Sequence, residues 1–341
     1  MKYVGVDLHK QTISVCVMVK AEEKRVVEQR RSLRCGDTES IRRFFERLGS
    51  FRMVVEATSS YEWLFLLIED LADRCVLAHP KKLRVIAEST QKSDKIDAKV
   101  LAEFLLLDMI PEAHRPSPRL RQYRVLVRHR HAVQRGITRI KCKLRHKLAF
   151  YNADIASLFT ARGQEHLAKL AMSHADRFEC DALWEQLSLL HKQLAAADKE
   201  LKAFAQTAPA AEREAREVLD TMPEVGPVTI DVVLSETGDV RRFRSAKRVV
   251  AYAGMDPCFR ESAGKGKQLH ISKEGSRLLR WALIETAWRL VGKSARWRRL
   301  FDRLRVTTGH KKKAIVGVAR RVLCVMYAML RDGAAYRAAA V

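Results

Sequence analysis

The sequence predicts an α/β domain at the N-terminus, followed by a long helical middle and a mostly helical C-terminal part. Over residues 1–108, short apolar runs bounded by polar turns alternate with amphipathic stretches. Over residues 119–150 the apolar residues instead recur at helical spacing. The 341 residues, 47% of them hydrophobic, suffice for two or three domains with separate cores.

The N-terminal part contains five predicted strands and four predicted helices. The strands are expected near residues 2–8, 12–19, 25–33, 51–56 and 74–78. The helices are expected near residues 37–48, 61–73, 80–89 and 94–107. Three successive strands followed by strand and helix in alternation predict a mixed sheet with helices on its faces.

Carboxylates end two of these strands. Asp7 ends the first strand and Glu56 ends the fourth, so the two acids face each other if the strands are neighbours. Asp94 and Asp97 lie three residues apart at the start of a helix and share one face of it. Alone, this second pair is also explained by helix capping. Four carboxylates together favour a site for two Mg²⁺ ions, which prefer hard oxygen ligands.

The charge distribution predicts a nucleic-acid partner. The chain has a net charge of +24, with 12 Lys or Arg and no acid between His114 and Lys147. A second basic region, Arg241 to Arg321, has 23 basic and 5 acidic residues. Two basic surfaces on a mildly acidic body fit a polyanion. A membrane surface is disfavoured because no stretch has a clean amphipathic Trp/Phe face.

The cysteines and the hydropathy pattern predict a cytoplasmic protein. The seven cysteines are scattered without a CxxC pair, which indicates reduced thiols rather than disulfides or zinc. The N-terminus is already a predicted strand, so no signal peptide is expected. No apolar run reaches the length of a membrane span.

The middle of the chain is expected to form two long helices. Arg115-Pro-Ser-Pro118 marks a boundary, and residues 119–150 form a basic helix with an apolar seam. Its candidate nucleic-acid contacts are Arg121, Arg124, Arg128, Arg135, Arg139 and Lys143. Between Leu183 and Phe204, apolar residues alternate at spacings of four and three, typical of a coiled coil. This segment either dimerises the protein or folds back on the basic helix.

The C-terminal part begins after an Ala/Pro-rich joint at residues 207–211. Met222-Pro-Glu-Val-Gly-Pro-Val-Thr229 resembles a helix-hairpin-helix turn, whose backbone amides approach a DNA phosphate. Further on, a predicted loop between Phe259 and Lys267 places Ser262 among glycines and basic residues. Residues alone do not single out this serine, since the other candidates are Ser59, Ser60, Ser272 and Ser276.

Taken together, these motifs resemble one family, the DEDD-type insertion-sequence transposases of family 110, which include pilin-gene invertases. The resemblance covers essentially the whole chain in order. It is carried by Val4-Gly-Val-Asp7, Val55-Glu-Ala-Thr58, Ser93-Asp-Lys-Ile-Asp-Ala98, Pro223-x-Val-Gly226, Ala251-Tyr-Ala-Gly-Met-x-Pro257 and Ile271-Ser-Lys-x-Gly275.

The resemblance implies a fold and a site. Residues 1–115 would form a ribonuclease H-like domain of the Holliday-junction-resolvase type, with Asp7, Glu56, Asp94 and Asp97 as its metal ligands. Residues 116–208 would form a basic helix and coiled coil for dimerisation and RNA binding. Residues 209–341 would form the transposase domain, in which Ser262 attacks DNA and becomes covalently linked.

The resemblance also implies partners. The family's recombinases are guided by a structured noncoding bridge RNA that pairs with double-stranded donor and target DNA, and dimers assemble into a tetramer. A nucleoid-associated, prokaryotic protein without a membrane partner is therefore expected. We further expect Arg260, Lys265 and Lys267 to steady the developing phosphate charge.

Three alternatives stay open at this point. A metal-dependent Holliday-junction-type nuclease would keep the fold but use water instead of serine. A non-enzymatic nucleic-acid binder would need none of the acids. A sugar-kinase-like ATPase shares the opening strand and its Asp, but it lacks support because Gly-rich phosphate loops are missing from the sequence and the charge favours a polymer.

Overall fold

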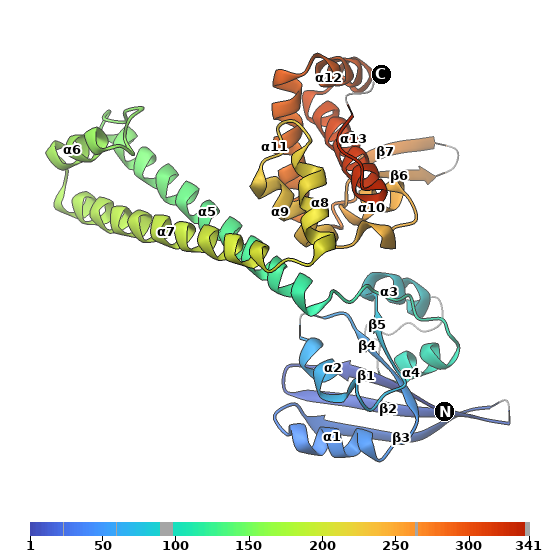
Figure 1. Ribbon diagram of the computed structural model, residues 1–341. Coiled ribbons are helices and arrows are strands. Elements are labelled where there is room, and N and C mark those ends of the chain that lie inside the picture. Colours follow the sequence, from blue (N-terminus) through green and yellow to red (C-terminus); the bar gives the residue numbers. More distant parts are fainter. Residues whose placement is uncertain (23, 59, 89–97, 263–264, 338–341) are drawn as a thin grey trace. The chain divides into compact units, whose positions relative to one another are not determined.

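The protein divides into two units, Met1–Arg115 and Pro116–Val341 (Figure 1). The structure, a computed structural model, describes residues 1–22, 24–58, 60–88, 98–262 and 265–337. The mixed α/β character of the first unit and the mostly helical character of the second are as the sequence predicts.

Unit 1 is built on a five-stranded mixed sheet with the strand order β3-β2-β1-β4-β5. The strands are β1 (Lys2–Leu8), β2 (Thr12–Ala21), β3 (Lys24–Arg34), β4 (Phe51–Glu56) and β5 (Arg74–Ala78). β1, β2 and β3 form an antiparallel meander, whereas β4 and β5 continue the sheet in parallel with β1. All five predicted strands are present, and β1 and β4 are neighbours.

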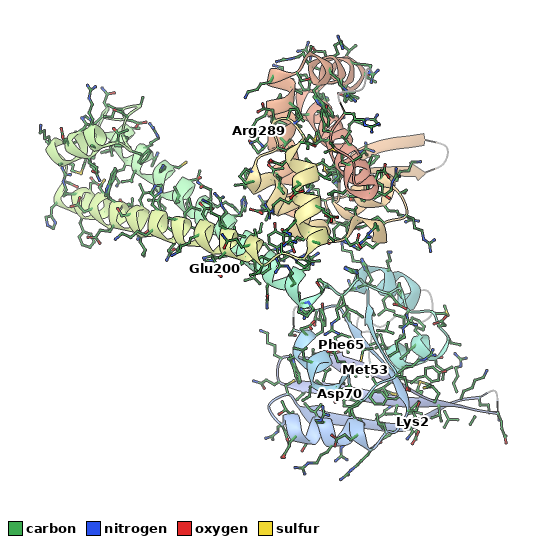
Figure 2. The ribbon with its side chains drawn as sticks, viewed as in Figure 1. Lys2, Met53, Phe65, Asp70, Glu200 and Arg289 are labelled. Carbon is green, nitrogen blue, oxygen red and sulfur yellow. The ribbon has the colours of Figure 1, made fainter. Side chains whose placement is uncertain are left out.

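Helices cover both faces of this sheet (Figure 1). On one face, α1 (Thr38–Glu46) and α2 (Glu62–Ile68) pack against inward side chains that include Val4 and Val6. Phe65 and Met53, labelled in Figure 2, belong to this core. On the other face lie α3 (Pro80–Glu88) and α4 (Ala98–Leu106), which bury Val54. Helix α2 ends earlier than predicted because the chain turns to enter β5.

Helix α4 comes unusually close to the backbone of β1. A Cβ placed on Gly5 would lie 2.0 Å from the carbonyl oxygen of Ala98 and 2.4 Å from the amide nitrogen of Ala102. Only glycine leaves room for this contact between a strand and a helix. Gly5 therefore sets the position of the first turn of α4 on the sheet.

Unit 2 begins with two long helices that run side by side, α5 (Pro118–Phe150) and α7 (His174–Gln206), with α6 (Ala161–Lys169) at their end (Figure 1). Ser117 caps α5, because its hydroxyl accepts a hydrogen bond from the amide of Leu120 at 3.2 Å. Leu183 and Leu187 of α7 are buried in one hydrophobic cluster with Val133, Ile137, Ile140 and Leu144 of α5. Of the two alternatives for the leucine seam, the structure therefore contains the intrachain hairpin.

The rest of unit 2 is a helical bundle with one small hairpin. Its elements are α8 (Ala210–Asp220), α9 (Pro227–Thr237), the 3₁₀ helix η1 (Val240–Arg242), α10 (Ala246–Tyr252), β6 (Pro257–Ser262), β7 (Lys265–Ile271), α11 (Arg277–Lys293), α12 (Ala295–Thr308) and α13 (Lys311–Asp332). Helices α11 and α13 form the centre of its core, where Leu279, Leu283, Val318 and Val322 are almost completely buried. The same core includes Tyr123 and Val127 from α5.

The segment that contains Ser262 differs from the sequence prediction. A loop was expected between Phe259 and Lys267, but the segment pairs as the antiparallel strands β6 and β7. Its glycines and charges lower the local strand propensity, so the sequence alone does not reveal the pairing. The pairing becomes evident only when the two strands satisfy each other's backbone hydrogen bonds.

Within the described ranges, no helix is both long enough and apolar enough to cross a membrane.

Candidate functional site

Two carboxylates meet at the ends of neighbouring strands in unit 1. The parallel register pairs Val6 with Val55. The next residues, Asp7 and Glu56, therefore lie side by side at the carboxyl ends of these two strands. Val4 and Val6 point into the core under α1 and α2, so the alternation of side chains places Asp7 on the opposite face, with Gly5 and α4. Glu56 lies on that same face, two residues after Val54. The predicted meeting of Asp7 and Glu56 is confirmed.

The two carboxylates of this pair repel each other. The pKa of Glu56 is raised above its ordinary value, first by burial and then by the negative charge of Asp7. Arg84 on α3 acts in the opposite direction but does not cancel the effect. His9 lies beside the pair, with its Nε2 atom 3.2 Å from Oδ2 of Asp7. A bound divalent cation would relieve this repulsion, and the carboxylate oxygens are suitable ligands.

The other two predicted acids, Asp94 and Asp97, lie outside the described residues. Ala98, the first described residue after them, has its carbonyl oxygen against Gly5, two residues before Asp7 in β1. In the part of the chain that is described, no three His, Cys, Asp or Glu side chains form a metal-ligand group. Asp7 and Glu56 are thus a pair of neighbouring carboxylates and not a complete group of metal ligands within the described residues.

The spacing of acids in the sequence does not identify two further residues near this pair, Gly5 and His9. Gly5 has no chemistry of its own, but a glycine inside an apolar strand signals the close approach of another backbone. His9 follows Asp7 by two residues in the turn before β2, and no spacing rule distinguishes it from an ordinary turn residue.

Ser262 ends strand β6 in unit 2. The antiparallel register places it opposite Lys265, and it places Arg260 opposite Lys267. Two competing serines have structural contacts, because Ser272 donates a hydrogen bond to Asp256 and Ser276 caps α11. Ser60 is exposed, and Ser59 lies outside the described residues. These contacts leave Ser262 as a stronger candidate than Ser272 or Ser276.

Several arginines of α5 are paired inside unit 2. Arg128 binds Glu236 with two hydrogen bonds of 2.8 and 2.9 Å, and the Glu236 side chain is only 2% exposed. Arg124 donates to the backbone carbonyls of Ser235 and Glu236. Further pairs join Arg119 to Glu212, Arg130 to Asp198, Arg145 to Asp154, and Lys147 to Asp176 and Glu179. Acids from other segments thus offset part of the positive charge of this helix, although the helix itself contains none.

The acids that offset the helix were missed for a physical reason. Most of them belong to α7, α8 and α9, which lie far away in the sequence and meet α5 only after folding. Local charge counting cannot find such partners. Arg121 is also engaged, since it donates to the backbone carbonyl of Pro116.

A second set of basic side chains on α5 points to solvent. Arg135, Arg139 and Lys143 are exposed and lie four residues apart, so they follow one side of the helix away from the apolar seam. Within the described chain, no ion pair engages these three side chains. Of the six predicted nucleic-acid contacts on α5, these three have their charges available to a ligand.

We predict that the paired and unpaired arginines of α5 behave differently. Arg128→Ala is expected to lower the free energy of unfolding by about 2 kcal/mol, because Glu236 would remain buried without its partner. Arg135→Ala, the matched control on the same helix, is expected to change it by less than about 0.5 kcal/mol. Urea denaturation followed by circular dichroism measures both. Equal destabilisation by the two variants would contradict this division.

Two family models match separate parts of the chain. Residues 4–153 match a family model for DEDD transposases of the IS110 type, and residues 216–302 match a model described as the transposase IS116/IS110/IS902 family. The first match contains Asp7, Glu56, Asp94 and Asp97, and the second contains Ser262.

Individual relatives agree with these matches. An uncharacterized 43.6 kDa protein of insertion element IS110 from Streptomyces coelicolor is 30% identical over 46% of this chain and 37% of its own length. A pilin gene-inverting protein from Moraxella bovis is 31% identical over 34% of this chain and 36% of its own length. A transposase for insertion sequence element IS1111A from Coxiella burnetii is 23% identical over 100% of this chain and 92% of its own length. The first two alignments thus span little more than a third of those relatives.

The fold and these matches place the chain in the transposase class of protein families. Within that class, the chain belongs to the IS110 family of insertion-sequence transposases. The acidic domain of this family implies dependence on a divalent metal.

Proposed function

We propose that this protein is an RNA-guided transposase that cleaves and rejoins DNA with a divalent metal and a serine nucleophile. The observation that carries the proposal is the convergence of Asp7 and Glu56 at the ends of β1 and β4, on the face that receives α4. This arrangement rests on a rigid sheet, which suits a catalytic metal site. It also gives the two carboxylates a reason to be adjacent despite their repulsion.

The proposed fold of unit 1 is ribonuclease H-like. Its support is the strand order β3-β2-β1-β4-β5, in which an antiparallel meander is extended by two parallel strands. In this proposal, residues 1–115 form the metal-binding domain and residues 116–208 form the helical domain for dimerisation and RNA binding. Residues 209–341 form the transposase domain.

We assign the metal ligands to Asp7, Glu56, Asp94 and Asp97. Two Mg²⁺ ions bound by these carboxylates would stabilise the negative charge that develops on the phosphate during strand cleavage. The support for Asp94 and Asp97 is indirect. The helix that follows them begins against Gly5, two residues from Asp7.

Ser262 is the proposed nucleophile. Its hydroxyl loses a proton, its oxygen forms a bond to the phosphorus of a DNA phosphodiester, and the bond to the departing strand oxygen breaks. A phosphoserine link and a free DNA hydroxyl result, and the reverse step rejoins the strands. Arg260, Lys265 and Lys267 are placed by the hairpin register on the same two strands, where their charge favours a phosphate.

The serine assignment predicts a trapped intermediate. Wild-type protein is expected to give a covalent protein–DNA adduct on denaturing gels, and Ser262→Ala is expected to give none. Ser60→Ala, which removes an exposed hydroxyl in unit 1, is the control and should leave the adduct unchanged. If Ser262→Ala still cleaves DNA at the normal rate, water is the nucleophile. The protein would then be a metal-dependent Holliday-junction-type nuclease.

The proposed partners are double-stranded donor and target DNA and a structured noncoding bridge RNA. Their support is the net charge of +24 and the exposed basic residues of α5. The predicted contacts comprise Arg121, Arg124 and Arg128 together with the unpaired Arg135, Arg139 and Lys143. A homodimer that assembles into a tetramer, acting at the nucleoid in the cytoplasm, completes the proposal.

The proposed guidance by a bridge RNA has a separate test. We expect protein purified from cells that carry its native flanking DNA to retain one discrete RNA encoded beside its gene. Sequencing the bound RNA measures this directly. Arg135→Ala combined with Arg139→Ala should reduce the retained RNA, because two unpaired charges are removed. Recovery of only heterogeneous cellular RNA would contradict guidance and leave a DNA-only recombinase.

A further inference from the structure

Helix α11 presents two large aromatic side chains to solvent. Trp281 is 40% exposed and Trp288 is 43% exposed, whereas Leu279, Leu283 and Leu290 of the same helix are buried in the core. Trp281 and Trp288 are seven residues apart, so they lie on one side of the helix, about 10 Å apart along its axis. Core packing accounts for the leucines but not for these two exposed rings.

Trp281 is held in place from a second helix. Its ring contacts the ring of His131 on α5, with the centroids 4.6 Å apart. The pKa of His131 is lowered by burial and by the neighbouring Arg135 and Arg130, so this imidazole is neutral at neutral pH. Trp288 is supported in turn by the ring of Phe301, at 5.5 Å. Both tryptophans are therefore ordered by a neighbouring aromatic ring while their outer sides stay open.

Three arginines lie near the two rings, and one acid, Glu285, lies between the rings on the same side of α11. Arg277 precedes Trp281 by one helical turn, Arg135 follows His131 by one turn, and Arg289 is adjacent to Trp288. Arg289, labelled in Figure 2, donates to the hydroxyls of Thr229 and Thr286 rather than to a carboxylate.

A cleft in the surface lies next to Arg289. It has a volume of about 440 Å³ and is lined by the turn from Glu224 to Thr229. On the exposed side of α11, Glu285 is the single acid between Arg277 and Lys293.

We propose that this surface, the tryptophan face, stacks the bases of unpaired nucleotides. It consists of Trp281, Trp288 and His131 with Arg135, Arg277 and Arg289. An exposed ring next to guanidinium groups matches an unpaired nucleotide, whose base stacks while its phosphate pairs with Arg. A duplex offers only its phosphates, because its base faces are already stacked. The inference deepens the proposed function and rests on it only for the choice of nucleic acid as partner.

Charge complementarity favours this occupant over a protein. The face is basic and the whole chain carries +24, so a second copy of the chain would meet like charge. A single strand of RNA and a displaced strand of DNA share the recognised chemistry, and the test below separates them.

The test compares single strands with duplexes at equilibrium. Full-length protein without divalent metal is titrated into a labelled oligonucleotide of about 12 nucleotides, as uridine RNA, as thymidine DNA and as a DNA duplex. Trp281→Ala is expected to weaken single-strand binding about fivefold or more and to leave duplex binding within about twofold. Trp281→Phe, which keeps an aromatic ring, should retain most of the affinity. Phe178→Ala, an exposed aromatic on α7, is the matched control and should change nothing.

A second measurement does not depend on the alanine variant folding. Adding the preferred single strand should quench tryptophan fluorescence, and Trp281→Phe should reduce the quenching. Tighter binding of RNA identifies the guide as the source of the unpaired bases, and tighter binding of DNA identifies a displaced strand.

Three results would overturn the inference. In the first, Trp281→Ala binds the single strand as tightly as the wild type does. In the second, the variant loses affinity for the single strand and for the duplex to the same extent. In the third, the variant changes the oligomeric mass, which would identify the face as a protein contact. The binding assay is independent of catalysis, because it is carried out without divalent metal. Failure here is thus distinguishable from failure of the proposed function.

Discussion

Replacing Asp7 by asparagine is expected to slow DNA strand cleavage by about 1,000-fold or more. The substitution keeps the shape of the side chain but removes the negative charge that would hold the metal beside Glu56 in the proposed site. Loss of several kcal/mol of stabilisation of the phosphate charge corresponds to a rate change of this size. The measurement is the initial rate of adduct formation on donor DNA at saturating Mg²⁺.

The control for Asp7→Asn is Asp70→Asn in the same unit. Asp70, labelled in Figure 2, is exposed and pairs at 2.6 Å with Arg42 of α1, a helix on the other face of the sheet from the acid pair. The Asp70→Asn variant should cleave at the wild-type rate, because an exposed ion pair contributes little to the stability of the fold. Glu56→Gln should resemble Asp7→Asn. Normal cleavage by both acid variants would show that the pair binds no catalytic metal.

Substituting Gly5 by alanine is expected to lower the free energy of unfolding of unit 1 by about 3 kcal/mol. The added methyl group would lie 2.0 Å from the carbonyl oxygen of Ala98 and 2.4 Å from the amide of Ala102. Both contacts are with backbone atoms, so no side-chain rotation relieves them, and α4 has to move away from β1. Urea denaturation of the full chain, followed by circular dichroism, measures the loss.

The matched control for Gly5→Ala is Gly36→Ala. A Cβ at Gly36 meets nothing within 4 Å, and the residue is not among those with positive φ, so the stability should hardly change. Gly5→Ala should also impair cleavage, because the helix that follows Asp97 is displaced. A Gly5→Ala protein with normal stability and normal cleavage would show that the close contact between α4 and β1 does not position the site.

The sequence by itself predicted the sheet of unit 1 well. The strands there are short apolar runs bounded by turns, and this local pattern specifies β1 to β5 without help from the rest of the chain. Asp7 and Glu56 were likewise identified as a pair, because an acid at a strand end is a local feature. Their adjacency needed only the condition that β1 and β4 be neighbours, and the structure meets that condition.

The hairpin around Ser262 shows where local patterns fail. Glycine and lysine in Lys265-Gly-Lys267 favour a loop, and the strand forms only because a partner strand is available. The leucine seam of α7 was similarly undecided between a partner chain and α5. Heptad spacing specifies that a seam is buried, but it does not specify against which helix.

What the sequence determined alone is therefore the order of the elements, the acids that end β1 and β4, and the basic composition. The tertiary structure decided which charges are free. Arg128 and Arg135 are equivalent in the sequence of α5, yet Arg128 is paired with the buried Glu236 and Arg135 faces solvent. The physical reason is that pairing depends on contacts between segments about 100 residues apart, and such contacts exist only when folding brings α9 against α5.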